Sequence, residues 1–204
     1  MNPATERDSA HVGQRSGRLP STSTAALSHV GLELFIARGF EATTVDDIAA
    51  AAGIGRRTFF RYFASKNDVP WGDFDGLLQR MRDHLRGVPD DVALWPGLRD
   101  AVVEFNRFPA AEAPIHRRRM ELILRVPALV AHSTLRYDAW RQVIADHAAE
   151  RLGQPADALE PQAIGWTCLG VALAAYDQWL ARDDADLGAL LIQAFTVLQR
   201  SFER

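Results

Sequence analysis

Apolar residues recur at helical spacing near the start of the chain and predict the first of several short helices. Four of them occupy positions i, i+3, i+7 and i+8, which form one helix face: Leu27, Val30, Leu34 and Phe35. Gly39 ends this helix, which therefore spans about 23–38. Thr44 is placed to cap a second helix that ends at Gly53. A third helix is predicted from residue 55 or 56 to 63.

The helical pattern continues through the rest of the chain. A fourth helix is predicted to open at Ser65 and to continue past Pro70 to Leu85. Five further helices follow, at about 94–105, 114–124, 128–152, 161–182 and 186–203. No stretch shows sustained alternation of apolar and polar residues, so we expect no sheet. The pattern predicts an all-α fold of about nine helices.

The composition is that of a globular protein rather than a disordered one. Of the 204 residues, 48% are hydrophobic and 24% charged, enough to bury a sizeable core. The formal net charge is −3, so binding to a polyanion requires a local basic patch. Residues 53–66 provide such a patch, because they contain four basic side chains and no acidic one.

Cysteine usage and the N-terminus indicate a cytoplasmic protein. Cys168 is the single cysteine, which excludes an intramolecular disulfide and a four-thiolate metal site. Residues 1–20 are polar, lack a secretory signal and predict a flexible basic tail. Arg15 and Arg18 in this tail are either solvated or an arm for a minor groove. The longest apolar-leaning run, 163–176, is shorter than the ~20 residues of a membrane span, so we expect no membrane partner.

The second and third helices have the layout of a helix-turn-helix. Ala49 is small where the two helices approach, and Gly53 supplies the turn. Ile54, Phe59 and Tyr62 give the third helix an apolar face and leave arginines on its outer side. A helix fits the major groove of B-DNA, where arginine binds guanine through two hydrogen bonds. We therefore expect double-stranded DNA as a partner.

These segments resemble the TetR family of transcriptional repressors. The resemblance is carried by residues 39–49, by Ala52-Gly53-Ile54 and by residues 58–66. A narrower one, carried by 55–63, 70–75 and 104–109, is to regulators of the mycofactocin redox-cofactor system of actinobacteria. The resemblance to the TetR family implies a DNA-binding domain at 21–66 and a helical ligand-binding and dimerisation domain at 67–204. It also implies a dimer on a palindromic operator, with repression relieved by ligand.

The resemblance also implies the DNA contacts. Arg56 and Arg57 would meet base edges, and Thr58 a base or phosphate. Phe60 stands where the family often has tyrosine, which leaves contact with a thymine methyl group. Asp46 replaces a residue that is often basic, which weakens a phosphate contact there. Three further residues would bind phosphate: Thr44, Tyr62 and Lys66.

Two interpretations apply to the apolar helices near the C-terminus. They form the core of a monomer, or they pair with a second copy in a two-fold dimer, which the resemblance favours. The dimer candidates are Ile164, Cys168, Val171, Ala175, Leu191, Phe195 and Leu198.

The resemblance also implies a small-molecule effector in the middle of the helical domain. Candidate lining residues are Leu78, Met81, Phe105, Phe108, Arg117, Met120, Leu124, Leu129, Trp140, Ile144, Trp166, Leu169 and Trp179. Three consecutive arginines at 117–119 form either a solvated surface run or an anchor for an anionic head group. The second interpretation suits an apolar effector such as a fatty acid or acyl-CoA.

Other classes of protein are less consistent with the sequence. No His-Glu-x-x-His or Gly-x-Ser-x-Gly motif is present, and Cys168 lies in an apolar helix. We therefore expect no enzyme, no metal and no cofactor. A basic solvated helix face is common, so the alternative function is a helical adaptor that binds proteins without specific DNA binding. Such an adaptor would not need Arg56 and Arg57 on an exposed helix.

Overall fold

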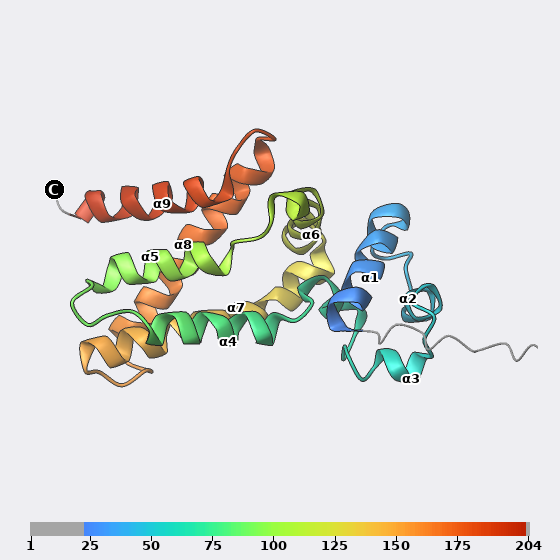
Figure 1. Ribbon diagram of the computed structural model, residues 1–204, viewed down its shortest axis with the longest axis horizontal. Coiled ribbons are helices and arrows are strands. Elements are labelled where there is room, and N and C mark those ends of the chain that lie inside the picture. The colour runs from blue at the N-terminus through green and yellow to red at the C-terminus, as the bar shows by residue number, and fades with distance from the viewer. Residues whose placement is uncertain (1–22, 203–204) are drawn as a thin grey trace, which may run out of the picture.

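The computed structural model describes residues 23–202, and within them it contains helices and no strand (Figure 1). The elements are α1 (Thr24–Arg38), α2 (Val45–Ala51), α3 (Arg56–Phe59), η1 (Lys66–Trp71), α4 (Phe74–Arg86), α5 (Leu94–Phe105), η2 (Ala110–Glu112), α6 (Ala113–Arg125), α7 (Pro127–Leu152), α8 (Leu159–Ala181) and α9 (Leu187–Phe202). The all-α prediction is confirmed. The predicted tail at 1–20 and residue 203 lie outside the described residues.

Local capping explains where the first helices begin. Ser23 accepts a hydrogen bond from the Ala26 N–H at the start of α1. Thr44 and Asp47 form a reciprocal capping box on α2, with the Asp47 N–H 3.1 Å from Thr44 Oγ1 and the Thr44 N–H 2.8 Å from Asp47 Oδ2. After α2, Gly53 adopts a φ of +66°, which a residue with a Cβ rarely adopts. The predicted cap and turn are therefore confirmed.

Two predicted helices differ from those observed. Regular α3 ends at Phe59, and turn hydrogen bonds, including that from the Tyr62 N–H to the Phe59 carbonyl, continue the chain to residue 63. The predicted fourth helix is two elements in the structure. Gly72, whose φ is +57°, follows the last residue of η1, and Asp73 is the N-cap of a separate helix, α4. Pro70 within η1 lacks an N–H, which disfavours a continuous α-helix through this segment.

The fold has two hydrophobic cores arranged along its long axis (Figure 1). Helices α1–α3 form a head at one end. Helices α4, α5, α7, α8 and α9 pack together at the other end, which we call the body, and α6 lies between the two. Leu129 at the start of α7 is fully buried in the head core, alongside Leu122 and Val126 from the α6–α7 corner. The expectation that Leu129 lines the effector site is wrong, because its side chain is buried in the hydrophobic core of the head.

Element η1 packs directly on α1. The buried stripe of α1 includes Ser28, Gly31 and Leu32, whereas Val30 and Leu34 from the predicted face stay partly exposed. Ser28 Oγ donates a hydrogen bond to the Val69 carbonyl over 2.7 Å. A Cβ on Gly31 would overlap the Val69 side chain, so only glycine permits this approach. The head therefore holds η1 through small and hydroxyl side chains that a purely apolar pattern does not reveal.

Helix α8 and helix α7 cross closely at Gly165, where an added Cβ would lie 2.9 Å from the Arg141 carbonyl oxygen. Among the helices of residues 23–202, none is both long and apolar enough to cross a membrane. Within the same residues, no cluster of three or more histidine, cysteine or carboxylate side chains has the arrangement of a metal site.

Candidate functional site

Helix α3 presents two arginines to solvent. Phe59 points inward and is fully buried, while Arg56, Arg57 and Phe60 are exposed. Arg56 Nη1 lies 2.8 Å from Asp46 Oδ2, and its guanidinium lies 5.4 Å from the centre of the Phe60 ring. Arg57 forms no ion pair with any residue between 23 and 202. The helix therefore carries one tethered and one untethered guanidinium.

The tether on Arg56 brings the start of α3 beside the first turn of α2. Thr44, the N-cap of α2, is exposed within this junction. Hydrogen bonds from Thr44 lower the pKa of the Asp47 carboxyl, so Asp47 is ionised and fixes the cap. Thr58 and Tyr62 are half-buried, and Tyr62 packs against the head core. The structure thus gathers Thr44, Arg56 and Arg57 at one junction.

Lys66 lies apart from these residues and faces the head. Its ammonium donates to the carbonyl oxygens of Phe40, Thr43 and Glu41 over 3.0, 3.2 and 3.5 Å, and it lies 4.4 Å from the Phe40 ring centre. These carbonyls belong to the α1–α2 loop, where the Phe40 carbonyl also accepts a hydrogen bond from the Thr43 N–H over 3.4 Å. The orientation corrects the expectation that Lys66 faces a duplex, since its three donors are already used.

We expect Lys66→Met to destabilise the head rather than to weaken DNA binding alone. The methionine keeps the apolar stem but removes the donor to three carbonyls, which corresponds to a loss of about 1–3 kcal/mol. Urea unfolding followed by circular dichroism measures this change. Arg61→Met, at an exposed arginine in the same segment, is the control and should change stability by less than about 0.5 kcal/mol. Unchanged stability with uniformly weaker DNA binding would return Lys66 to the phosphate role.

A buried carboxylate joins the head to the body. Asp68 Oδ2 accepts from the Ser65 N–H and Oγ over 3.0 and 2.9 Å. Asp68 Oδ1 accepts from His132 Nε2 over 2.8 Å and from Arg136 Nη2 over 2.7 Å. Burial opposes ionisation, but the hydrogen bonds from Arg136, His132 and Ser65 outweigh it and lower the pKa of Asp68. An ionised Asp68 therefore fastens η1 to α7.

A partly open, largely apolar cavity of about 110 Å³ lies between η1, α4, α5, α6, α7 and α8. It is lined by Pro70, Trp71, Phe74, Leu77, Phe105, Asn106, His116, Arg119, Met120, Ile123, Tyr137, Trp140, Leu169, Ala172, Leu173 and Tyr176. Four predicted lining residues are among them: Phe105, Met120, Trp140 and Leu169. Phe108 lines an adjoining outer pocket of about 350 Å³ that Asn106 also borders.

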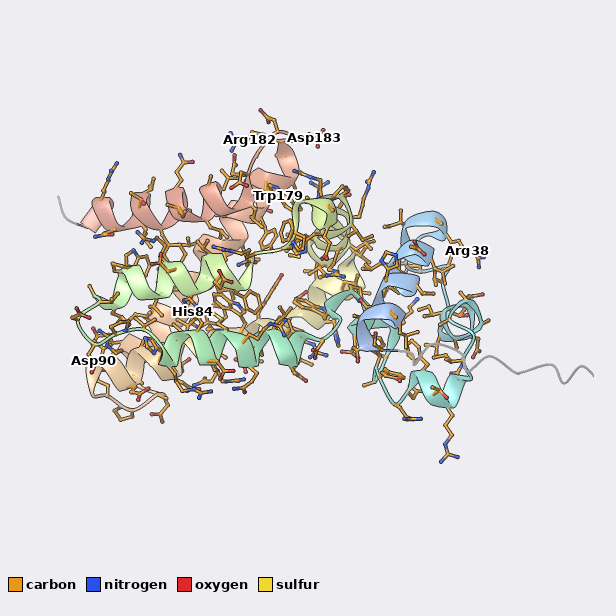
Figure 2. The ribbon with its side chains drawn as sticks, viewed as in Figure 1. Arg38, His84, Asp90, Trp179, Arg182 and Asp183 are labelled. Atoms are coloured by element: carbon orange, nitrogen blue, oxygen red, sulfur yellow. The ribbon has the colours of Figure 1, made fainter. Side chains whose placement is uncertain are left out.

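The other predicted lining residues have different surroundings. Leu78, Met81 and Ile144 are buried in the body core, and Leu124 packs against that core from outside. Trp179 borders the outer pocket and is buried, whereas Arg182 follows it at the C-terminal end of α8 (Figure 2). None of these five predicted residues lines the inner cavity.

Two predicted contacts with the effector are wrong in orientation. The Arg117 guanidinium lies 4.2 Å from the Trp179 ring centre and donates to the carbonyl oxygens of Trp179 and Arg182. It therefore caps the end of α8. Trp166 is 59% exposed and lies over the Arg141 guanidinium, 4.2 Å from ring centre to carbon, on the outer surface of the body. Both side chains make other contacts outside the cavity.

The cavity wall contains a polar chain that the sequence analysis missed. Tyr176 Oη donates to Asn106 Oδ1 over 2.7 Å, and Asn106 Nδ2 donates to the Val102 carbonyl over 2.7 Å. The Tyr176 proton is thus used, so the 2.9 Å contact with His116 requires a donating His116 Nε2–H. Burial lowers the pKa of His116 to about 3 and raises that of Tyr176, so both are neutral.

Arg119 is the member of the arginine run that reaches the cavity. His116, Arg119, Met120 and Ile123 follow one another at i, i+3, i+4 and i+7, and all four line it. This helical spacing was available in the sequence and distinguishes Arg119 from Arg117. Arg118 is exposed and pairs with Glu121 over 3.1 Å.

The predicted dimer residues divide into two groups. Cys168, Leu191 and Phe195 are buried in the body core, which corrects their assignment to an interface, whereas Ala175 is buried in that core and also borders the surface groove between α8 and α9. Burial also raises the pKa of the Cys168 thiol to about 12. Ile164 packs partly against the same core.

An apolar groove lies between α8 and α9 on the surface. Val171, Ala175 and Leu198 from the predicted set line it, together with Thr167, Gly170, Ala174, Gln178, Arg182, Leu190, Gln193, Ala194 and Val197. Val197 is 58% exposed, and Ile192 on the same helix is 46% exposed. Helices α8 and α9 therefore expose apolar side chains on their outer face, in addition to those that are buried in the body core. The outward positions follow from packing, which helical periodicity could not assign on helices that are apolar nearly all round.

Comparison with known proteins links both halves of the chain to one family. Residues 27–69 match the model of "Bacterial regulatory proteins, tetR family", and residues 92–203 match that of the "MftR C-terminal domain". A protein of Mycobacterium tuberculosis named as the mycofactocin biosynthesis transcriptional regulator MftR is 45% identical over 190 residues, covering 93% of this chain and 96% of that protein. The match therefore extends from the head through the body.

Solved structures show the same fold. FadR of Thermus thermophilus, in complex with lauroyl-CoA, aligns with a TM-score of 0.55 at 22% identity, over 86% of this chain and 93% of that chain. The fatty acid degradation regulator FadR of Bacillus halodurans aligns with a TM-score of 0.59 at 19% identity, over 84% and 95%. With exposed arginines on a helix-turn-helix head, a cavity in a helical body and two matching family models, this chain belongs to the TetR family of bacterial transcriptional regulators.

Proposed function

We propose that the protein is a ligand-responsive repressor that binds a palindromic operator as a homodimer in the cytoplasm. The observation that carries the proposal is the exposed pair Arg56 and Arg57 at the start of α3, with Arg57 untethered by any described residue. An arginine on a helix in the major groove binds guanine O6 and N7 together. The family of the chain is one of regulators, and we propose no enzymatic activity for it.

The test is binding to the promoter DNA of its own gene region in a gel shift. A specific complex whose affinity falls steeply as salt rises is the expected result, because phosphate contacts release counterions. Binding with no preference over unrelated DNA would remove the repressor proposal and favour the helical adaptor. The 45% identity to the mycofactocin regulator makes genes for that system the first promoters to examine.

We expect the α8–α9 groove to hold the second copy of the chain. Val197→Glu places a carboxylate on this apolar face and should shift the protein from a dimer to the 22.6 kDa monomer in sedimentation at micromolar concentration. Val130→Glu makes the same change at an exposed valine of α7 and should leave the dimer intact. A dimer that persists in Val197→Glu would place the interface elsewhere. Two-fold symmetry then sets half-sites about 34 Å apart, or a multiple of this.

The cavity in the body supports an apolar effector of the fatty acid or acyl-CoA class. Apart from His116, Arg119, Asn106 and two tyrosines, the residues that line the cavity are apolar. At about 110 Å³ it is smaller than the ~300–1,000 Å³ of a ligand pocket, so an acyl chain must push lining residues apart. Pro70 and Trp71 of η1 are in that wall, and η1 also packs on the head. Ligand entry would therefore disturb the head and release the operator.

A further inference from the structure

Three side chains that line the cavity have hydrogen-bond donors without a partner in the protein. These donors indicate which acceptor group the effector carries. We infer that the effector is an apolar molecule with one oxygen acceptor, a carboxylate or a carbonyl, which Arg119, Tyr137 and Trp71 bind. This inference rests on the proposed function, since it assigns the chemistry of the ligand in the same cavity. It selects among apolar compounds by a single polar group.

Arg119 is a partly buried cation with no carboxylate within ion-pair distance, although the charge of Glu112 partly offsets the effect of burial on its pKa. Its Nε is inaccessible to solvent and has no hydrogen-bond partner, and no described residue forms an ion pair with it. Burial lowers the pKa of its guanidinium, which means that the charged form is poorly solvated there. An isolated buried charge is costly, and a bound anion or strong acceptor would offset that cost.

Two further donors belong to residues of the same wall. Trp71 Nε1 and Tyr137 Oη are buried and make no hydrogen bond of good geometry, although the nearby Ser133 hydroxyl partly offsets the rise that burial causes in the pKa of Tyr137. The Trp71 and Tyr137 rings meet edge to face with centres 5.7 Å apart. Buried polar groups are nearly always paired, so three unpaired donors on the lining residues of one small cavity need an explanation. All three groups can donate a hydrogen bond, and a shared oxygen acceptor would satisfy them.

The other polar groups of the wall are already paired. His116, Tyr176 and Asn106 satisfy one another and end on the Val102 carbonyl. His116 is neutral, which leaves Arg119 as the one positive charge among the lining residues. The remaining wall is apolar. The cavity therefore favours a neutral or anionic acceptor on a hydrocarbon and disfavours a cation.

The experiment compares three ten-carbon probes with the full-length protein: decanoate, methyl decanoate and decanol. Calorimetry should show decanoate binding most tightly, methyl decanoate next and decanol least. Arg119→Met keeps an unbranched stem but removes the guanidinium, and it should weaken decanoate about 10- to 100-fold, with a smaller loss for decanol. Tyr137→Phe should weaken decanoate and methyl decanoate about 3- to 10-fold. Arg118→Met, on the exposed neighbour, is the matched control and should bind all three probes as the parent does.

A second readout needs no ligand. Arg119→Met removes a partly buried charge that desolvation disfavours, so the ligand-free variant should melt at a higher temperature than the parent, whereas Arg118→Met should not. Equal affinity for all three probes, or decanoate binding that survives in Arg119→Met, would overturn the inference. So would an absence of binding by any probe, which would leave the donors to buried water. Operator binding by the ligand-free protein, measured in parallel, tests the proposed function separately from these outcomes.

Discussion

Arg57→Ala should weaken binding to the operator about 10- to 100-fold without changing the fold. The side chain is exposed and forms no ion pair with a described residue, so its removal leaves no buried group unpaired. If it binds guanine with two hydrogen bonds, the loss corresponds to about 1–3 kcal/mol. Fluorescence anisotropy on the operator and on single-base variants measures both affinity and base preference.

Arg56 and Arg61 provide the comparison for this result. Arg56→Ala should also lose affinity, but Arg56 must leave Asp46 to reach DNA, and an exposed pair of this kind is worth up to about 1 kcal/mol. Asp46→Asn should accordingly strengthen binding slightly by freeing Arg56. Arg61→Ala, at an exposed arginine after α3, should change affinity without changing base preference. The base-reading role fails if Arg57→Ala lowers affinity equally on all sequences.

Asp68→Asn should destabilise the protein and loosen the joint between η1 and α7. The change removes the negative charge that faces His132 and Arg136, and the neutral amide that replaces the carboxylate can no longer accept all four hydrogen bonds. We expect a loss on the order of 2–3 kcal/mol, less than for a fully buried pair because the Arg136 side chain keeps 25% exposure. Urea unfolding gives the free energy of unfolding.

Asp75→Asn is the control, because Asp75 faces the same Arg136 over 3.7 Å but is 88% exposed. It should change stability by less than about 0.5 kcal/mol. The pH dependence adds a second readout. A carboxyl whose folded pKa is lowered contributes stability above its unfolded pKa of about 3.9 and loses it as pH falls through the folded value. The parent should therefore lose more stability than Asp68→Asn below about pH 4, and equal acid sensitivity would contradict the assignment.

The contact between η1 and α7 also provides a test of how ligand binding is coupled to operator binding. Asp68 fastens to α7, Val69 fills the head core, and Pro70 and Trp71 line the cavity, all within one element of six residues. If η1 carries the coupling, a variant of Asp68 should change the effect of ligand on operator affinity as well as stability. An unchanged ratio of operator affinities with and without ligand in Asp68→Asn would remove η1 from the coupling route.

Local patterns predicted the head well because local chemistry builds it. Thr44 caps α2, Gly53 takes a positive φ, and Phe59 is buried as expected. Each of these features depends on neighbours within a few residues. Lys66 was different, because its partners are the carbonyls of a loop more than twenty residues earlier in the chain.

In the body, helical spacing alone could not predict which apolar side chains are buried and which are exposed. Helix α8 is apolar on several faces, so periodicity could not separate buried Cys168 from exposed Trp166. On α6 the spacing did contain the answer, since Arg119 is in register with His116 and Met120, but the three consecutive arginines obscured it. The joint at Asp68 required residues 64 and 68 positions apart, and no pattern in the sequence links them.

The sequence by itself determined the helices, the turn between α2 and α3, and the exposed arginines of a DNA-binding head. These follow from backbone capping, glycine conformation and the helical spacing of apolar and charged side chains, all of which act over a few residues. Tertiary structure alone decided which donors face the cavity, which arginine caps α8 and how η1 joins head to body. Those contacts depend on how separate helices pack, because side chains meet across helices that the chain order leaves far apart.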